Sequence, residues 1–586
     1  MKVLLLQLPI PPFGPEPVRG NVPLAGAYLK LYAQRVEGIA AEIELFPPAL
    51  ADALGDAALV REITDRRPDV LGFACYLWNV ERSLFLAEQV KRLLPTVRVV
   101  LGGPEITPDN AWVLRHPAVD YAVIGEGEQT FAELLRYLGE TIGKRADEPV
   151  IAGLWSRRRQ EIPPPRRQLD HLNDVGRVYL EGILRPETFD SLFLETIRGC
   201  IFKCGFCFYP KSFDRLTYMD AELVAANLAI ARESGISEVF LLDPTLNQRR
   251  DFTEFLRLLA AGNSSRTFTY SAELRAEGIR AEHARLMAEA GFAEVELGLQ
   301  SVDRTAQALM HRTVNLPAFE RGVRAMMDAG IRTRVDLIIG LPGDTADSVR
   351  RGLDYLAHSH LYSEIQVFRL AVLPGTDFRR CYRELGLEFQ PHPPYHVLRT
   401  PTLSSEEIAD LMREAESLFG TEFDPLPNLP APVSGNSSAI GDSSKEGTQW
   451  AIDLDSDPPL LPPDTVGVAQ VLRFSSRDFS RHGAAMRRWV AHLLDHNPHG
   501  TLWIVFDVAE GGNLPRERDL ESLLEACYRR PLSYLDWYFS LQPKLRKMGA
   551  KRLIIHAPPS YGKRAERLRR RLPWVEFVTR DLSPAR

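Results

Sequence analysis

The sequence lacks any apolar run long enough to cross a bilayer, since none approaches the roughly 18 residues that a membrane helix needs. The first 13 residues contain an apolar run, but Gln7 and Pro9 interrupt it and no small-residue cleavage site follows, so we expect no signal peptide. An excess of basic charge is also missing: the formal net charge is -6. This argues against a general nucleic-acid binder, which needs a basic surface to neutralise phosphates. We expect a soluble, cytoplasmic protein with neither membrane nor nucleic acid as a partner.

Cysteine is scarce, with 6 in 586 residues, which excludes a disulfide framework and favours a reducing compartment. Three of them, Cys200, Cys204 and Cys207, lie within eight residues at the spacing Cys-x3-Cys-x2-Cys. A compact thiolate set of this kind is a soft-metal ligand, suited to an iron–sulfur cluster or to zinc. A closed zinc site needs a fourth ligand, but no second Cys-x2-Cys pair occurs and the next thiol is Cys381. Three ligands to a four-iron cluster leave one iron open. Structural or zinc-bound cysteines remain the alternative.

The chain is too long for one hydrophobic core, so two to four domains are expected. Residues 2–135 alternate short apolar runs, at 3–8, 42–46, 70–75, 97–101 and 121–124, with helical patterns. This alternation predicts a parallel α/β sheet, whose ligands bind beyond the carboxyl ends of the strands. The loops expected there are rich in glycine, proline and aromatic residues: residues 11–14, 76–79, 102–105 and 125–128. Glycine lets the backbone approach a bulky ligand closely.

The alternation restarts at residue 191, with strands expected at 192–197, 238–242, 267–272, 294–299, 334–339 and 364–370. Six βα units predict a partial version of the (β/α)8 barrel, in which the chemistry lies on the loops after the strands. The polar residues expected there are Asp243, Glu273, Arg275, Gln300 and Ser301. Asp336 is expected in mid-strand and facing inward, where it is either functional or paired with Arg334.

The remainder of the chain begins with a helix at residues 402–419, where Ser404 and Glu407 form a capping box. Residues 424–465 are rich in Pro, Ser, Gly and Asp and predict a flexible linker. Residues 466–586 predict a small α/β unit with strands at 466–474, 501–508 and 552–556 and helices at 487–495, 519–529 and 534–547. His492 and His496 are one helical turn apart, but without a partner ligand we interpret them as surface residues.

The cysteine spacing, with Phe206 before the third cysteine, resembles the signature of the radical S-adenosylmethionine enzymes. Gly102-Gly103-Pro104-Glu105 and Gly125-Glu126-Gly127-Glu128 resemble elements of the cobalamin-binding domain that precedes the barrel in many of these enzymes. The resemblance implies an N-terminal Rossmann-like cobalamin-binding domain, a partial (β/α)6 TIM-type barrel and a small C-terminal α/β domain. The division is 1–140 cobalamin-binding, 141–190 connector, 191–385 barrel, 386–423 helical extension, 424–465 linker and 466–586 C-terminal domain.

The resemblance also assigns residues to three cofactors. The [4Fe-4S] ligands are Cys200, Cys204 and Cys207, and S-adenosyl-L-methionine is bound by Phe206, Asp243, Glu273, Arg275, Gln300 and Ser301. The cobalamin-binding residues are Phe13, Leu77, Trp78, Asn79, Gly102, Gly103, Pro104, Glu105, Gly125, Glu126, Gly127 and Glu128. Two departures from the family pattern stand out. No Asp-x-His-x-x-Gly occurs in residues 1–150, which implies cobalamin without a histidine ligand, its lower face covered by Leu77 or Trp78. The usual Gly-Gly-Glu after the second barrel strand is replaced by Asp243-Pro244-Thr245.

Most characterised relatives of this kind are methyltransferases, so the resemblance implies methylation of an unactivated carbon, or of phosphorus, in a small-molecule or peptide substrate. A 5′-deoxyadenosyl radical would remove a substrate hydrogen, and the substrate radical would take a methyl group from cobalamin. An external electron donor of the flavodoxin or ferredoxin type is implied as a partner. Two alternatives stay open: cobalamin-dependent radical cyclisation or rearrangement without methyl transfer, and a non-catalytic cobalamin-binding regulator.

Overall fold

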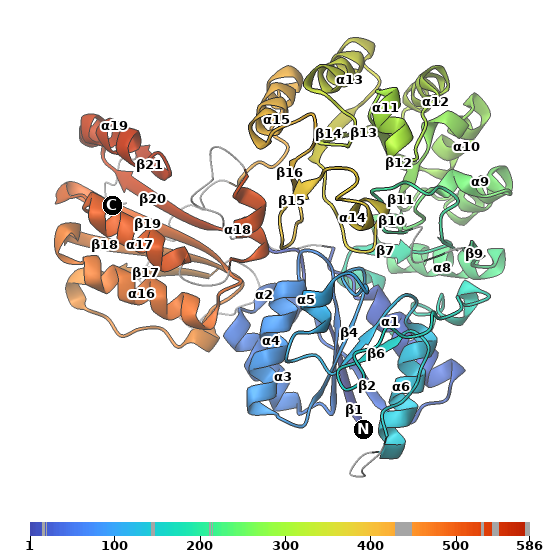
Figure 1. Ribbon diagram of the computed structural model, residues 1–586, viewed down its shortest axis with the longest axis horizontal. Helices are drawn as coiled ribbons and strands as arrows, with labels where there is room; N and C mark the ends of the chain where they lie inside the picture. Colours follow the sequence, from blue (N-terminus) through green and yellow to red (C-terminus); the bar gives the residue numbers. More distant parts are fainter. Residues whose placement is uncertain are drawn as a thin grey trace.

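The protein is described here by a computed structural model that covers residues 1–14, 18, 20–141, 147–209, 213, 215–427, 448–528, 532–541 and 550–579. It contains three α/β units, each built around its own largely parallel sheet. The N-terminal unit (blue) lies against the barrel (green to yellow), and the C-terminal unit (orange to red) lies beside them (Figure 1). The fold class predicted from the sequence is confirmed. No helix in the described ranges is long and apolar enough to span a bilayer.

The N-terminal unit is a six-stranded sheet in the order β2-β1-β3-β4-β5-β6, of which only β6 is antiparallel. Its strands are β1 (Lys2–Gln7), β2 (Glu42–Leu45), β3 (Val70–Ala74), β4 (Arg98–Gly102), β5 (Tyr121–Val123) and β6 (Leu154–Ser156). Its helices are α1 (Leu24–Leu31), α2 (Pro48–Ala53), α3 (Asp56–Arg66), α4 (Val80–Leu93), α5 (Ala111–Leu114) and α6 (Glu128–Thr141). Along β1, Val3 and Leu5 pack with α1 and α6, while Leu4 and Leu6 pack with α3 and α4. The strands are therefore apolar on both faces, as parallel strands covered by helices must be.

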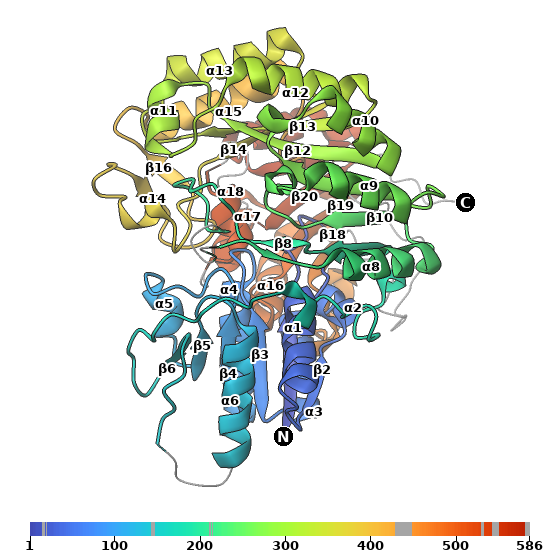
Figure 2. The same ribbon diagram turned by 90° about the vertical axis from the view of Figure 1, so that its right-hand side faces the viewer.

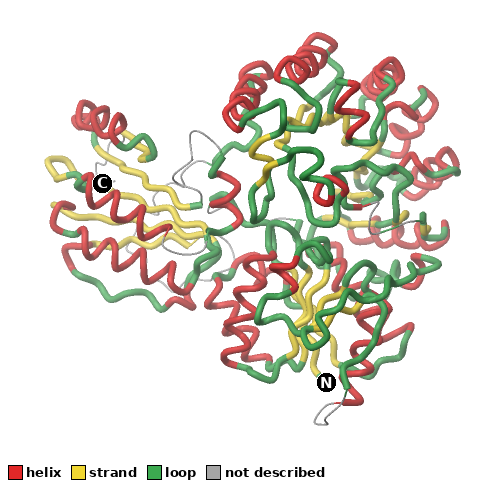
Figure 3. The backbone as a smooth tube through the Cα atoms, viewed as in Figure 1, coloured by secondary structure: helices red, strands yellow, loops and turns green. Residues whose placement is uncertain are grey.

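The second unit is an open barrel of six parallel strands in the order β14-β13-β12-β11-β10-β7. Its strands are β7 (Ser191–Leu194), β10 (Glu238–Leu241), β11 (Thr269–Leu274), β12 (Phe292–Gln300), β13 (Arg332–Ile339) and β14 (Glu364–Arg369). The helices outside it are α8 (Ala221–Ser234), α9 (Phe252–Gly262), α10 (Ala281–Ala290), α11 (Arg304–Leu309), α12 (Leu316–Asp328), α13 (Ala346–Ser359) and α15 (Ser405–Phe419). The strands curve inside this layer of helices (Figure 3). Figure 2 shows the strands of the N-terminal unit rising from the N-terminus toward the barrel.

The C-terminal unit is a five-stranded parallel sheet in the sequential order β17-β18-β19-β20-β21. Its strands are β17 (Thr448–Asp453), β18 (Ala469–Asp478), β19 (Thr501–Asn513), β20 (Lys551–Ala557) and β21 (Val575–Thr579). Right-handed connections between sequential parallel neighbours place their helices on the same face. The helices α16 (Gly483–His496), α17 (Glu517–Tyr528) and α19 (Gly562–Arg571) accordingly share one core with that face of the sheet.

Two strands lie where the sequence predicted irregular chain. The connector at 141–190 contains β6, a short antiparallel edge strand whose three residues gave too weak a pattern to recognise. The predicted linker at 424–465 contains β17, which completes the C-terminal sheet at its edge, with Trp450 and Ile452 turned toward the C-terminal core. The Pro and Ser residues around β17 concealed this alternation. Residues 142–146 and 428–447, which belong to the predicted connector and linker, lie outside the described residues, as do 542–547 of the predicted helix at 534–547.

The short helix α18 (Tyr534–Phe539) connects the C-terminal unit to the other two. Its Asp536 forms a buried ion pair of 2.6 Å with Lys551 on β20. On its other side, Trp537 stacks on His392 of the barrel extension at 5.4 Å between ring centroids, and Phe539 contacts Phe13 of the N-terminal unit at 5.0 Å. All three units therefore meet at α18.

Candidate functional site

The cysteine loop lies between β8 (Ile197–Arg198) and β9 (Thr217–Tyr218), two short antiparallel strands beyond the end of β7. Gly199 turns the chain into the loop with φ +106, and a Cβ there would lie 2.3 Å from the Arg215 carbonyl oxygen, so only glycine fits. The backbone of Gly205 donates to Met310 and accepts from Phe378. The loop is thus fixed to the barrel by its own main chain.

The three thiols of this loop are of the type that binds a soft metal. All three are free; Cys204 is buried, and Cys200 and Cys207 are partly buried. Burial raises the pKa of the Cys200 thiol, and raises that of Cys207 to about 12. At neutral pH these groups would stay protonated unless a metal displaced the protons, because metals bind thiolates. Among the described residues, no three His, Cys, Asp or Glu side chains are grouped as for a single metal ion.

Asp243, predicted as a cofactor contact, holds the chain that leads into the cysteine loop. Its buried carboxylate accepts hydrogen bonds from the backbone N–H groups of Thr196 and Ile197, at 2.7 and 2.9 Å, and from the Thr196 hydroxyl. Burial raises the pKa of Asp243 to about 6 despite these bonds. In the structure Asp243 therefore fixes the backbone that enters the cysteine loop.

Three carboxyl groups face the lumen of the barrel: Glu273 on β11, Glu296 on β12 and Asp336 on β13. Desolvation and then the charge of Glu296 raise the pKa of Glu273 to about 7 and that of Asp336 to about 8. Asp336 shares a hydrogen bond with Glu296, while its Oδ1 atom is buried without a partner in the described structure. Gln300, in a left-handed conformation with φ 67, also has a buried Oε1 atom without a partner. Mutually repelling carboxyls and unused acceptors fit a ligand that carries positive charge and N–H or O–H donors.

Arg312 is a site residue that sequence reasoning missed. Its Nη1 atom lies 3.8 Å from the Cys204 sulfur, its Nη2 donates to the Gly298 carbonyl, and its Nε is buried without a partner in the described ranges. It reaches the cysteine loop from a loop 108 positions away in the chain, and no local motif marks such a contact.

Arg275, which we predicted to bind S-adenosylmethionine, already contacts neighbouring residues of the protein. It bonds Glu277 and the Thr313 carbonyl, each at 2.9 Å, and lies over the Phe202 ring at 4.2 Å. Ser301 is likewise engaged: its hydroxyl lies 3.3 Å from Asp344 and accepts the Asp303 N–H. Phe206 packs partly buried against the core. These three assignments stay predictions.

The raised pKa values make ligand binding in the lumen sensitive to pH. Below pH 7 both Glu273 and Asp336 carry protons, and above pH 8 both are ionised. We expect the affinity for S-adenosylhomocysteine, whose ammonium these carboxylates would bind, to fall about tenfold as the pH is lowered from about 9 to about 6. The free energy of unfolding of the ligand-free protein has the opposite pH dependence. A carboxyl whose pKa is raised in the folded state contributes stability at low pH, and this contribution is lost as the pH rises through about 8.

Isothermal titration calorimetry of the wild type and Asp336→Asn measures this dependence. The variant should bind more weakly at high pH and show a flatter profile. Asp328→Asn, which alters an exposed carboxyl on α12, is the control and should follow the wild type. An unchanged profile in Asp336→Asn would exclude this carboxyl from the ligand site.

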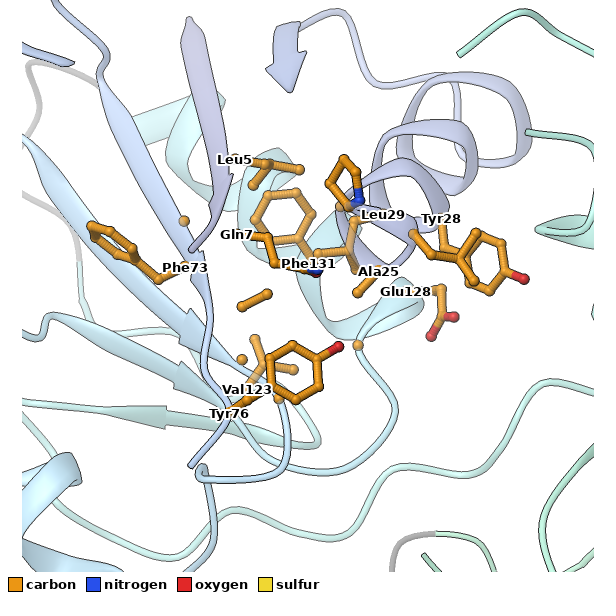
Figure 4. Close-up of a pocket in the computed structure, with 18 of the residues that line it drawn as sticks. Leu5, Gln7, Ala25, Tyr28, Leu29, Phe73, Tyr76, Val123, Glu128 and Phe131 are labelled. Carbon is orange, nitrogen blue, oxygen red and sulfur yellow. The ribbon is translucent and has the colours of Figure 1, made fainter. Parts of the chain in front are cut away.

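A cavity of about 570 Å³ lies at the carboxyl ends of β1, β3, β4 and β5, between the N-terminal unit and the barrel. It extends down between the sheet and the helices α1 and α6, where Leu5, Leu29, Val123 and Phe131 surround it (Figure 4). At its upper end the wall is formed by Phe193, Glu195, Arg198, Tyr209, Phe213 and Leu242. A mainly apolar slot with a polar mouth suits a large ligand with one apolar end.

The glycines of both Gly-rich loops line this cavity, and so do the two glutamates of the Gly-Glu-Gly-Glu loop. The lining includes Gly102, Gly103, Gly125, Glu126, Gly127 and Glu128. A Cβ at Gly103, where φ is +106, would lie 2.6 Å from the Cys75 carbonyl oxygen. Within the sheet, a Cβ at Gly72 would lie 2.6 Å from Leu5. A larger residue would therefore not fit at Gly103 or Gly72, two positions that line the cavity.

The loop after β3 gives the cavity an aromatic wall. Trp78 and Tyr76 both line it and stack on each other, 4.6 Å apart and nearly parallel. Asn79 is buried beneath them, accepting from Tyr76 N and donating to the carbonyls of Leu8 and Ala74, so it shapes the loop. Leu77 is not among the lining residues. Of our two candidates for the lower face of the corrin, the structure places only Trp78 at the cavity.

Three further residues assigned to cobalamin lie elsewhere. Phe13 packs on Tyr538 and Phe539 of α18. Glu105 is buried and accepts from the Tyr395 hydroxyl at 2.7 Å and from Asn110 at 2.9 Å, with its pKa raised to about 7 by desolvation. Neither these two nor Pro104 belongs to the lining of the cavity.

Arg198, two residues before Cys200, joins the cavity to the cysteine loop. Its guanidinium pairs with Glu126 at 2.5 Å, with Glu128 at 2.9 Å and with Glu195 at 2.9 Å. The Arg198 side chain is 6% exposed and those of Glu126 and Glu128 are 4% and 6% exposed, so the cluster is buried. The Gly-Glu-Gly-Glu loop of one unit is therefore bound directly to the cluster loop of the next.

Comparisons with known proteins agree with this arrangement. Residues 27–135 match the B12 binding domain family, and residues 194–356 match the radical SAM superfamily. Both matches fall on the units that carry the cavity and the cysteine loop.

Three curated relatives are similar in sequence. The 2-(S-pantetheinyl)-carbapenam-3-carboxylate methyltransferase of Streptantibioticus cattleyicolor is 27% identical over 69% of this chain and 61% of its own length. The cobalamin-dependent radical SAM methyltransferase TokK of Streptomyces tokunonensis is 28% identical over 61% and 54%. The anaerobic magnesium-protoporphyrin IX monomethyl ester cyclase of Rubrivivax gelatinosus is 26% identical over 52% and 57%. The chain thus spans only about half to three fifths of the length of these relatives.

Two solved structures share the fold. The radical S-adenosylmethionine methyltransferase TsrM from Kitasatospora setae superimposes with a TM-score of 0.56 at 18% identity, over 71% of this chain and 89% of that one. The cobalamin-dependent S-adenosylmethionine radical enzyme OxsB superimposes with a TM-score of 0.55 at 16% identity, over 71% and 66%. At these identities the likeness concerns the fold alone.

Proposed function

Because this chain joins a B12-binding domain to a radical SAM domain, we propose that it is a cobalamin-dependent radical S-adenosylmethionine methyltransferase. The cofactors predicted from the sequence are those that these two families take: a [4Fe-4S] cluster, S-adenosylmethionine and cobalamin. The methyl acceptor in this proposal is an unactivated carbon, or phosphorus, of a small-molecule or peptide substrate. An external flavodoxin or ferredoxin supplies electrons.

The buried cluster around Arg198 is the observation that supports a joint reaction. Glu126 and Glu128 line the cavity, and the Arg198 guanidinium that they bind belongs to the strand that enters the cysteine loop. The cavity and the iron site therefore share a wall. Cofactors bound in the cavity and at the cysteine loop would therefore be neighbours, which a transfer between them requires.

Each proposed cofactor has residues that fit it. Cys200, Cys204 and Cys207 would hold the cluster, while Asp243 keeps the chain entering their loop in place. The residues proposed for S-adenosylmethionine are Glu273, Gln300 and Asp336 for its ammonium and ribose hydroxyls and Arg312 for its carboxylate. A guanidinium beside Cys204 with an unused Nε would suit the carboxylate of S-adenosylmethionine.

Cobalamin would occupy the cavity between the N-terminal sheet and the barrel. The residues that would hold it are the glycines of the two Gly-rich loops, Trp78 and the apolar side chains beside α1. When bound, the cluster supplies the electron that cleaves S-adenosylmethionine to a radical, and cobalamin supplies methyl transfer. The chain's own residues bind and orient these groups, and the apolar walls keep water from the reaction space.

Product analysis tests the proposal. Anaerobic protein reconstituted with iron, sulfide and hydroxocobalamin should convert S-adenosylmethionine into both 5′-deoxyadenosine and S-adenosylhomocysteine when reductant and substrate are present. 5′-Deoxyadenosine alone would favour a radical cyclisation or rearrangement, the reaction class to which the Rubrivivax relative's name belongs. Neither product would favour a cobalamin-binding regulator.

A pair of variants on α1 assigns the cavity to cobalamin. Ala25 lies at the cavity (Figure 4). Ala25→Trp should fill the space and lower the amount of hydroxocobalamin retained by about tenfold or more, and S-adenosylhomocysteine should be lost while 5′-deoxyadenosine persists. Lys30→Trp, on the same helix and outside the lining, should retain both products. Full cobalamin retention by Ala25→Trp would place the cofactor elsewhere.

A further inference from the structure

The C-terminal sheet has one face that its own helices do not cover. Leu472, Phe474, Ile504 and Phe506 belong to the core shared with α16, α17 and α19, whereas the alternating residues Val471, Trp503, Val505 and Ile554 form a separate cluster on the opposite face. Because successive side chains of a strand point to opposite faces, Arg473, Asp507 and His556 lie on this second face. They come from three neighbouring strands, β18, β19 and β20.

These three residues form one charged group. Arg473 donates from Nε and Nη2 to the two carboxylate oxygens of Asp507, at 3.0 and 2.8 Å. The Nδ1 atom of His556 lies 3.1 Å from Asp507 Oδ1 and 3.2 Å from Arg473 Nη2. Since arginine can only donate and the carboxylate can only accept, the arrangement is consistent when His556 Nδ1 carries a proton and donates it to Asp507. An anion at Nε2 requires a proton there as well, so the bound form has His556 as an imidazolium whose Nε2–H is a donor that the fold leaves unused.

Both side chains are left with unused nitrogen atoms. Arg473 is 7% exposed and His556 is 0% exposed. Arg473 Nη1 and His556 Nε2 are buried and have no hydrogen-bond partner in the described part of the chain. A charged donor buried without an acceptor is costly, and native proteins rarely leave one so. The two Asp507 oxygens contact Nε and Nη2 of Arg473 and Nδ1 of His556, and neither unused nitrogen is bonded to them.

The group is also within reach of solvent. The Asp507 side chain is 24% exposed, and Ser475, its neighbour in the register on β18, is exposed. Ser475 is the fourth residue from the end of β18 and His556 the second from the end of β20, near the edge at which parallel α/β sheets bind their ligands.

We propose that this face of the C-terminal domain is a binding site for an anionic group, the carboxylate or phosphate of a small molecule, held between Arg473 Nη1 and His556 Nε2. Charge-assisted hydrogen bonds from these two groups supply the two contacts that the fold leaves open. Asp507 contacts both donors from the other side, and its negative charge opposes an anion bound to them. The site needs neither the iron–sulfur cluster nor cobalamin, so it stands or falls independently of the proposed methyl transfer.

Isothermal titration calorimetry on the full-length protein, in chloride buffer, tests the site with sodium phosphate and with sodium acetate as separate probes. One of the two should bind saturably with one site per chain, and which one does identifies the chemical class. Arg473→Gln and His556→Gln should each weaken binding by about tenfold or more. Arg477→Gln, which changes an exposed arginine on the same strand, should bind like the wild type.

Asp507→Asn separates a binding site from a purely structural cluster. Removing the carboxylate that competes for Arg473 should leave anion binding as tight as in the wild type or tighter, whereas loss of a structural element would weaken it. Far-UV circular dichroism establishes that each variant is folded, and if Arg473→Gln is not, His556→Gln and Asp507→Asn carry the test. Absence of saturable binding by either anion, or unchanged affinity in His556→Gln, would overturn the proposal.

Discussion

Replacing Cys204 with alanine should abolish the iron–sulfur absorption of the reconstituted protein and lower 5′-deoxyadenosine formation about a thousandfold or more. Cys204 is the most buried of the three thiols and the one that Arg312 approaches. With two cysteines remaining, no described residue is positioned to restore a third ligand. The electron that cleaves S-adenosylmethionine then has no source, and the other residues of the site cannot compensate for a lost member of the same unit.

The matched control is Cys381→Ala, which removes an exposed thiol outside the loop. It should retain the full iron and sulfide content and the wild-type rate of cofactor cleavage. Iron and sulfide analysis, the visible spectrum and quantification of 5′-deoxyadenosine are the measurements. If Cys204→Ala keeps cleaving the cofactor, or if anaerobically purified wild type carries zinc at this loop, the assignment of the site is wrong.

Replacing Arg198 with methionine should destabilise the N-terminal unit and the barrel together. The substitution leaves the buried carboxylates of Glu126 and Glu128, and the nearby Glu195, without their cation. Removing one partner of a buried ion-pair cluster costs about 3–5 kcal/mol, because the remaining charges are desolvated and uncompensated. We expect that loss in the free energy of unfolding, measured by urea denaturation followed by circular dichroism, together with weaker retention of hydroxocobalamin.

A control variant and a compensating variant test whether the loss of stability comes from the uncompensated buried charges. Arg35→Met breaks an exposed pair with Glu181 and should change the stability by less than about 1 kcal/mol. Adding Glu126→Gln and Glu128→Gln to Arg198→Met should recover part of the lost stability, since it removes the uncompensated charges. Equal stability of Arg198→Met and the wild type would mean that the cluster does not hold the two units together.

The sequence predicted those features whose physical signal is local. The alternation of apolar strands and amphipathic helices indicated two α/β units, and the structure has their strands near the expected positions. The capping box was also local: Ser404 and Glu407 bond each other's backbone at the start of α15. The cysteine spacing belongs to the same class, since three thiols within one short loop are close together whatever surrounds them.

The features that sequence reasoning missed depend on contacts between distant segments. Arg312 reaches Cys204 from a loop after α11, and Arg198 meets Glu126 and Glu128 from another unit; neither pair shares a motif. The acids of the Gly-rich loops were assigned to cobalamin with the glycines beside them. In the structure the glycines line the open cavity. Glu126 and Glu128 instead bind Arg198, and Glu105 binds Tyr395. A motif thus identified the loop but not the partner of each side chain.

The position of α18 limits how the protein can open. Asp536 fastens the helix to its own sheet, while Trp537 and Phe539 press on the barrel extension and on the N-terminal unit. The N-terminal unit and the barrel are therefore held together at this border by a helix of the C-terminal unit. Deleting residues 448–586 would remove α18 and, with it, these contacts to both of the other units.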